Sequence, residues 1–152
     1  MKRFALALVA LLVLVTAGWA DVMTKDVLLV GTESTYPPYE FRDDKNNLKG
    51  FDVDLMESIG AELGKKIEWV DMPFDSLIPA LLAKKIDIVA AGMSSTPERA
   101  KRVAFSENYE VSISAFIVVE GNDTMKAMPD MKGKTVAVQL GTVQETYSQS
   151  IE

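Results

Sequence analysis

The stretch that decides the fold joins an apolar run to a helix start and reads Ile86-Asp87-Ile88-Val89-Ala90-Ala91-Gly92-Met93-Ser94-Ser95-Thr96-Pro97-Glu98-Arg99. Its first six residues have the length and composition of a buried strand, and the Gly/Ser stretch is typical of a loop. Thr96 fits the N-cap of a helix and Pro97 its first position. A strand that leads into a helix N-terminus directs backbone N–H groups at one point, where the planar fork of Arg99 suits a carboxylate. The junction therefore predicts a site for a small carboxylate.

Outward from this junction, strand-like and helix-like segments alternate along the chain. The patterns predict strands over residues 27–31, 66–71 and 86–91, and helices over residues 52–63 and 74–83. Gly64 fits the stop of the first helix. A polar turn at residues 43–47 separates two short segments between the first strand and the first helix. This alternation predicts an α/β fold whose mostly parallel sheet is covered on both faces.

The second half of the chain repeats the first junction in miniature. Residues 109–119 predict a strand long enough to leave one domain and enter another. Residues 135–139 predict a further strand, followed by the loop Leu140-Gly141-Thr142 and a helix that starts at Val143. A second strand–loop–helix junction that offers N–H groups is what the second wall of a cleft between two lobes needs.

The first twenty residues have the three parts of a secretory signal. They are the basic Met1-Lys2-Arg3, the uncharged run 4–17 and the small-residue end Gly18-Trp19-Ala20. We expect cleavage after Ala20 and a mature chain that is exported and does not insert into the membrane. The alternative is an uncleaved anchor, but the apolar run is short for a membrane span.

The composition excludes several classes of partner and chemistry. The formal net charge is −6, so the chain offers no basic footprint for nucleic acid or anionic lipid. The sequence has no Cys, which excludes disulfides, zinc–thiolate sites and the acylated Cys of a lipoprotein. It also has no His, the commonest general base and metal ligand. Any catalysis would therefore have to use carboxylates, Lys, Tyr or Ser. We expect no metal, no cofactor and no catalytic residues.

Five motifs stand in order along the mature chain. They are Gly31-Thr32-Glu33 through Pro38; Gly50-Phe51-Asp52-Val53-Asp54-Leu55 with Ile59-Gly60 and Leu63; Phe74-Asp75-Ser76-Leu77-Ile78-Pro79; Thr96-Pro97-Glu98-Arg99; and Gly133-Lys134-Thr135-Val136-Ala137-Val138. With these motifs, the chain from Val27 onward resembles the family 3 periplasmic solute-binding proteins of polar amino acid ABC transporters, the type that binds glutamine or lysine, arginine and ornithine.

The resemblance implies the two-lobe, type II periplasmic-binding-protein-like α/β fold. It divides the chain into a signal peptide at residues 1–20, lobe 1 at residues 21–113 with the ligand-binding corner, and residues 114–152 with a hinge and the start of lobe 2. Because members of this family run longer, we expect a C-terminally truncated member with lobe 1 nearly complete and lobe 2 only begun.

The resemblance also implies which residues hold the ligand's carboxylate and amine. Arg99 matches the arginine that grips the α-carboxylate. Gly92 and Ser94 match the loop that supplies backbone groups and a hydroxyl, and Thr142 and Val143 match the amides of the second lobe. The ordinary alternative is that Arg99 is a solvated helix charge and Ser94 a turn residue.

Four further residues match positions near the ligand's side chain. Tyr36 and Phe74 match the aromatic pair that sandwiches it, Glu33 stands where the family usually has an Asp, and Gln144 follows the second-lobe loop. An acidic Glu33 favours a basic ligand slightly over glutamine. Tyr36 and Phe74 are otherwise packing residues, and Glu33 is otherwise a surface charge.

Asp52 and Asp54 invite a metal-binding interpretation. We favour a structural one, in which Asp52 caps the helix and both carboxylates meet the free N–H groups and the positive end of the helix dipole in its first turn.

The function that the resemblance implies is binding without chemistry. A monomeric periplasmic protein closes two lobes about hinge strands around an amino acid and delivers it to an inner-membrane ABC permease. Two alternatives remain open at this point, namely an enzyme similar to cyclohexadienyl dehydratase and a ligand-sensing domain of a larger receptor or lytic transglycosylase.

Overall fold

The computed structural model describes residue 22 and residues 24–151. These residues fall into two compact units. Unit 1 ends at Met93, and unit 2 begins at Ser94. The expected signal peptide lies outside the described residues, and the lobe boundary expected after residue 113 stays a prediction. None of the described helices is long and apolar enough to cross a membrane.

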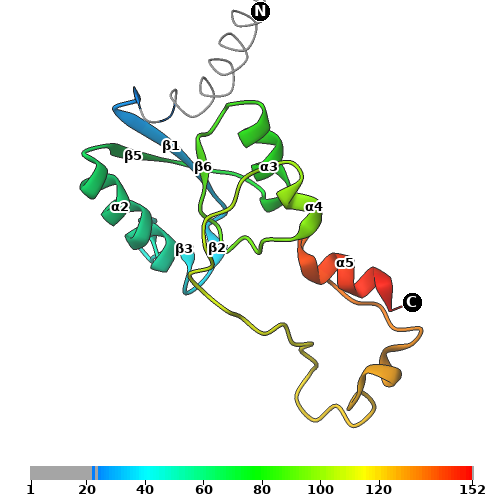
Figure 1. Ribbon diagram of the computed structural model, residues 1–152. Helices are drawn as coiled ribbons and strands as arrows, with labels where there is room; N and C mark the ends of the chain where they lie inside the picture. The colour runs from blue at the N-terminus through cyan, green and yellow to red at the C-terminus, as the bar shows by residue number, and fades with distance from the viewer. Residues whose placement is uncertain (1–21, 23, 152) are drawn as a thin grey trace, which may run out of the picture. The chain divides into compact units, whose positions relative to one another are not determined.

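Unit 1 is built on a sheet of three parallel strands. Its order is β5 (Lys66–Asp71), β1 (Val27–Thr32) and β6 (Ile88–Val89), so β1 lies in the middle (Figure 1). The predicted parallel sheet is thereby confirmed. Strand β6 is shorter than the expected 86–91, but the Asp87 and Ala90 amides still donate to the carbonyls of Leu29 and Gly31 at 2.7 and 3.0 Å.

Two helices cover the two faces of this sheet, α2 (Phe51–Leu63) and α3 (Phe74–Leu82) (Figure 1). On one face Leu28 and Val30 of β1 pack with Met56 of α2. On the other face Leu29 packs in the cluster around Leu77 of α3. Because successive side chains of a strand point to opposite faces, a strand buried on both sides is apolar at almost every position.

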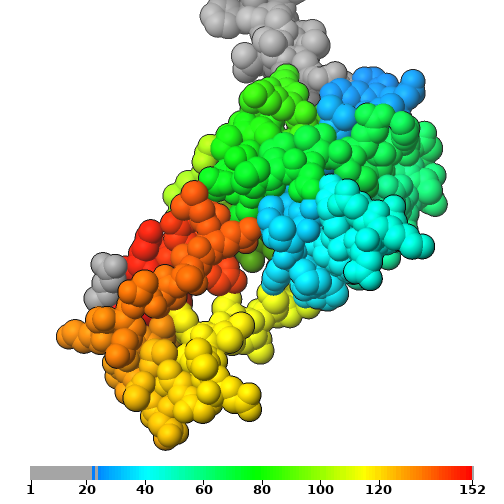
Figure 2. Space-filling view, turned by 180° about the vertical axis from the view of Figure 1, so that it is seen from behind, coloured from blue at the N-terminus to red at the C-terminus, as the bar shows by residue number. Residues whose placement is uncertain are grey.

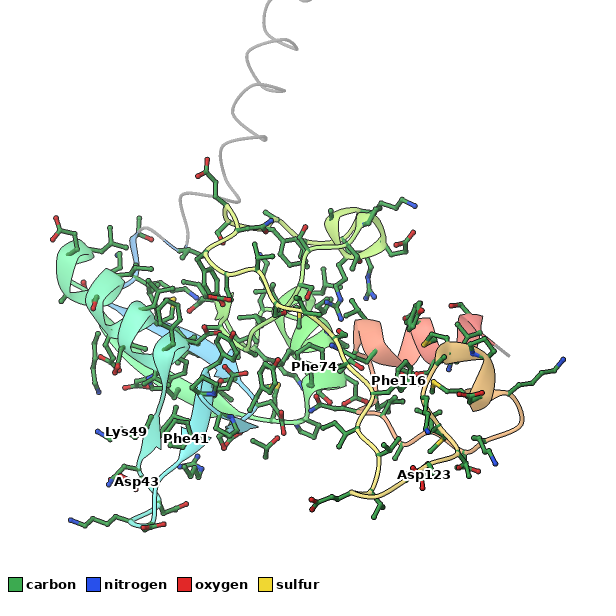
Figure 3. All side chains as sticks on the ribbon, turned by 90° about the horizontal axis from the view of Figure 1, so that it is seen from below. Phe41, Asp43, Lys49, Phe74, Phe116 and Asp123 are labelled. Atoms are coloured by element: carbon green, nitrogen blue, oxygen red, sulfur yellow. The ribbon has the colours of Figure 1, made fainter. Side chains whose placement is uncertain are left out.

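A small antiparallel sheet lies between β1 and α2 in the chain. Its strands are β2 (Thr35–Tyr36), β3 (Glu40–Arg42) and β4 (Leu48–Lys49), in that order. The predicted polar turn joins β3 to β4, and its Asp43 carboxylate accepts hydrogen bonds from the backbone amides of residues 45 and 47 (Figure 3). In Figure 2 this part of the chain, light blue to cyan, lies on the surface of unit 1.

Asp71, the last residue of β5, ties this small sheet to the large one. Its Oδ2 accepts hydrogen bonds from Arg42 Nε at 3.2 Å and Nη2 at 2.8 Å, and its two oxygens also accept from the Ser34 amide and hydroxyl. The small sheet is therefore fixed against the end of β5 at two points.

Helix α2 ends as predicted and begins differently. Gly64 adopts the left-handed conformation at its C-cap. The N-cap is Gly50 and no side chain caps the helix, so the expectation that Asp52 is the cap is wrong. Asp52 is instead buried, with 1% of its surface exposed, and its Oδ2 accepts a hydrogen bond from the Gly92 amide at 2.7 Å.

Unit 2 contains short helices and no strand among its described residues. The elements are α4 (Pro97–Ala100), the 3₁₀ helix η1 (Met128–Met131) and α5 (Val143–Ser150). The predicted strands 109–119 and 135–139 are wrong for this structure. Their sequence has strand propensity, but no strand among the described residues pairs with either segment, and Ile113 and Ile117 are 94% and 96% exposed.

Substitution of Gly50 tests the chain path into α2. Its φ is +132°, and an added Cβ would lie 2.1 Å from the carbonyl oxygen of Tyr39. Gly64 is the matched control, because its φ is +64° but nothing lies within 4 Å of an added Cβ. We expect Gly64→Ala to lower the free energy of unfolding by about 1–2 kcal/mol, and Gly50→Ala by about 1–3 kcal/mol more. Urea unfolding of both variants measures the difference, and equal losses would contradict it.

Candidate functional site

Gly92 lies three residues after the end of β6, where the sequence predicts part of an anion site. Its φ is +53°, and an added Cβ would lie 3.1 Å from Cε1 of the Tyr36 ring. The backbone of Gly92 therefore lies close to that ring, an approach that only glycine permits without displacement. The hydrogen bond from its amide to Asp52 fixes this backbone to α2.

The two predicted aromatic residues of unit 1 have different surroundings. Tyr36 is 46% exposed and stacks on Tyr39, with ring centroids 5.1 Å apart. Phe74, the first residue of α3, is half-buried and packs against the core around Leu77 (Figure 3). Tyr36 is thus partly exposed, although Tyr39 stacks on its ring. Its pairing with Phe74 around a ligand stays a prediction.

Three acidic side chains of unit 1 act on one another near Glu40. Glu40 of β3 and Asp52 of α2 are each 1% exposed, and Glu33 follows β1 and accepts a hydrogen bond from the Thr35 hydroxyl at 2.5 Å. Burial, the charges of Asp52 and Glu33 and a hydrogen bond with Asp52 raise the pKa of Glu40 to about 9. At neutral pH Glu40 is therefore protonated and can donate to Asp52.

Arg99 in unit 2 joins two loops through its side chain. Thr96 caps α4 as predicted, its hydroxyl accepting from the Arg99 amide at 3.2 Å. The guanidinium donates from Nη1 to the Ser94 carbonyl at 2.7 Å and from Nη2 to the Gly141 carbonyl at 2.8 Å. Burial lowers the pKa of Arg99, yet an arginine keeps its charge in proteins.

The start of α5 also forms as the sequence predicts. The Thr142 hydroxyl caps it by accepting from the Glu145 amide at 3.2 Å, and Val143 is its first residue. The Glu145 carboxylate accepts from the Gly141 amide at 2.7 Å. The loop 140–142 is therefore held from two sides, by Glu145 at its amide and by Arg99 at its carbonyl.

The side of α5 is attached to the extended segment that precedes it in unit 2. Gln144 Nε2 donates to the Ser114 hydroxyl at 2.9 Å. The Phe116 ring lies 6.4 Å from that of Tyr147, and Figure 3 shows Phe116 beside this helix. Gln144 thus has a structural role, and its ligand role stays a prediction.

The nine predicted site residues divide between the units. Unit 1 holds Glu33, Tyr36, Phe74 and Gly92, and unit 2 holds Ser94, Arg99, Thr142, Val143 and Gln144. Within unit 1, the structure brings Tyr36 and Gly92 together. Within unit 2, Arg99 connects Ser94 to the residue before Thr142.

Sequence reasoning missed the buried carboxyl pair of Glu40 and Asp52. Both positions are in the quoted motifs or beside them, but a charged residue in a short strand or a first helical turn is ordinarily solvated. The one available signal is the Gly50-Phe51-Asp52 motif, which does not reveal that the carboxylate reaches Gly92.

Comparison with known proteins gives one family for most of the chain. The model for bacterial extracellular solute-binding proteins, family 3, matches residues 28–148. A probable histidine-binding protein of Campylobacter jejuni is 41% identical over 132 residues, which are 87% of this chain and 51% of that protein. The arginine-binding extracellular protein ArtP of Bacillus subtilis is 43% identical over 121 residues, 80% of this chain and 47% of that protein.

Solved structures agree with these sequence matches. An ancestral arginine-binding protein bound to arginine has a TM-score of 0.76 and 44% identity, and the match covers 84% of this chain and 56% of that one. The arginine-bound form of a mutant of domain 1 of the T. maritima arginine-binding protein has a TM-score of 0.57 and 47% identity, with 60% of this chain and 70% of that one covered. The chain spans about half the length of the relatives it matches.

Substitution of Thr142 tests the cap that shapes the loop 140–142. We expect Thr142→Ala to destabilise the start of α5 by about 1 kcal/mol, because the amide of Glu145 loses its acceptor. Amide hydrogen exchange of residues 143–150 should then be roughly fivefold faster. Thr146→Ala is the control from the same helix, since its hydroxyl makes only a 3.4 Å contact with the Thr142 carbonyl. Equal acceleration in both variants would argue against the cap.

Proposed function

Because this chain belongs to the bacterial extracellular solute-binding proteins of family 3, we propose that it binds a basic L-amino acid, with arginine as the first candidate and glutamine as the second. The proposal assigns the ligand's α-carboxylate to Arg99, Ser94 and the Thr142–Val143 amides of unit 2. It assigns the ligand's side chain to Tyr36, Phe74 and Glu33, with Gly92 and Gln144 completing the set.

The arrangement of Arg99 is the observation that carries this proposal. The bonds to Ser94 and Gly141 hold the guanidinium in one orientation. They use two of the five N–H donors of an arginine. A guanidinium held in one orientation loses little conformational freedom when it binds a carboxylate, which favours a bidentate contact.

The acidic and aromatic groups of unit 1 favour a cationic side chain. The exposed ring of Tyr36 can stack on a guanidinium or on an aliphatic stem. Glu33 is near enough to Glu40 to raise the pKa of that carboxyl, so negative charge accumulates on this side of unit 1. A basic ligand would be attracted by that charge, whereas glutamine would gain only hydrogen bonds.

The relatives support a basic ligand by what their names say they bind, which is histidine in one protein and arginine in another. The domain 1 structure is of particular use, because it is an arginine-bound form of a single domain. It supports binding by a chain that spans about half of a full-length relative.

We further propose that the chain acts in transport. A secretory signal would place it in the periplasm as a cleaved monomer without a lipid anchor, and an inner-membrane ABC permease would receive its ligand. The relatives reported above are binding proteins by name, so they favour this role over catalysis.

A ligand panel tests the proposed function. The full chain is unfolded thermally, alone and with each L-amino acid at millimolar concentration. Arginine at a hundred times its Kd should add about 2.7 kcal/mol to the free energy of unfolding, and alanine should add nothing measurable. A rise with glutamine alone would correct the ligand, and a cooperative transition that no amino acid moves would overturn the proposal.

Substitution of Arg99 tests the carboxylate contact. We expect Arg99→Ala to weaken arginine binding by roughly 10–150-fold, the range for hydrogen bonds to a charged group. The arginine affinity of Arg99→Lys should fall between those of the wild type and Arg99→Ala, because lysine keeps the positive charge but lacks the planar guanidinium. Arg102→Ala is the control, because Arg102 is an exposed arginine three residues along the chain. Calorimetric titration gives the affinities, and equal losses at both arginines would contradict the assigned role.

A further inference from the structure

Two carboxyl groups from distant parts of unit 1 meet in its interior. Glu40 comes from β3 and Asp52 from the first turn of α2, and each residue is 1% exposed. The backbone holds them together, because the Asp52 amide donates to the Tyr39 carbonyl at 3.0 Å, next to Glu40. Oε2 of Glu40 receives no hydrogen bond from the described residues.

The pair is connected directly to the backbone of Gly92. Oδ2 of Asp52 accepts the Gly92 amide at 2.7 Å, and an added Cβ at Gly92 would lie 3.9 Å from Oε1 of Glu40. The distance between donor and acceptor is that of a strong, charge-assisted hydrogen bond. A change in the charge of this pair would therefore act directly on the hydrogen bond that holds the Gly92 amide.

The titratable groups that act on Glu40 are all acidic. Asp52 faces it from α2 and Glu33 from the loop after β1, and together with burial they raise the pKa of Glu40 to about 9. A carboxyl group buried beside other carboxyl groups keeps its proton, because burial and the neighbouring negative charges both disfavour its charged form.

We propose that Glu40 and Asp52 are positioning residues that share one proton and thereby hold the Gly92 backbone in its ligand-binding conformation. The inference rests on the proposed function for the part played by Gly92, but the proton-sharing pair itself is testable without any ligand. When protonated, Glu40 can donate to Asp52, whose Oδ2 accepts the Gly92 amide. Loss of the proton to solvent puts a negative charge on Glu40 beside the carboxyl group that holds Gly92.

The sign of the expected pH effect follows from the direction of the shift. Glu40 holds its proton to about pH 9 when folded and to its ordinary 4.5 when unfolded. Between these values the folded state binds the extra proton, so the stability it contributes is complete below pH 4.5 and falls as pH rises to about 9. The equilibrium constant for unfolding should rise up to tenfold for each pH unit in this window.

The composition of the chain makes the titration of Glu40 easy to observe. The sequence has no His and no Cys, so no side chain with an ordinary pKa between 5 and 9 masks the titration of Glu40. Unfolding of the full chain is measured from pH 5 to pH 9.5 for the wild type and for Glu40→Gln, whose amide keeps the shape and can still donate to Asp52. Glu62→Gln, an exposed change on α2, is the matched control.

We expect the wild type and Glu62→Gln to lose stability in parallel as pH rises, and Glu40→Gln to show a nearly flat profile. Equal slopes in all three chains would overturn the proposal. If Glu40→Gln fails to fold, the Gly92 amide resonance of the wild type is followed as pH rises. We expect its chemical shift to change with a midpoint near pH 9. A chemical shift that does not change would overturn the inference.

Measurements of arginine binding at different pH values separate this inference from the proposed function. Arginine affinity should fall above pH 9 in the wild type and hold in Glu40→Gln. No arginine binding at any pH would refute arginine as the ligand, while the unfolding profiles and the Gly92 resonance would still decide for or against the pair. Affinities that change identically with pH in both chains would refute the link from the pair to binding.

Discussion

Unit 1 depends on the double pairing of β1. This strand is hydrogen-bonded to β5 on one edge and to β6 on the other, and its faces are covered by α2 and α3. Full burial of a Leu or Val side chain contributes about 1.5–3 kcal/mol, and β1 buries Leu28 and Val30 almost completely. The ends of β1 and β5, to which Glu33 and the small sheet are attached, are thereby fixed in place.

The elements of unit 1 were predictable because their patterns are local. The expected strand 66–71 agrees with β5, and the expected helices 52–63 and 74–83 differ from α2 and α3 by one residue at one end. Periodicity fixes which face is buried, and Gly64 fixes where α2 stops. Residues 109–119 show the limit of such patterns, because strand propensity becomes a strand only where another backbone supplies the hydrogen bonds.

The candidate site likewise has a part that local sequence patterns predict and a part that they do not. Thr96 and Thr142 were predictable as caps, since a cap is a contact across three residues. The contacts that orient the site are long-range: Arg99 to Gly141 spans 42 residues, and Gly92 to Asp52 spans 40. No local pattern shows that a carboxylate is buried rather than solvated. The chemistry of the site could thus be read from residue types, whereas its geometry required the fold.

The exposed segment in unit 2 has a consequence for handling the protein. Val111-Ser112-Ile113-Ser114-Ala115-Phe116-Ile117-Val118-Val119 contains neither a charge nor a proline, and Val111, Ile113, Ile117 and Val119 are more than 80% exposed. Uncharged stretches of high strand propensity with free backbone groups are templates for intermolecular β-pairing. We therefore expect self-association through this stretch to limit the concentration at which the protein can be stored.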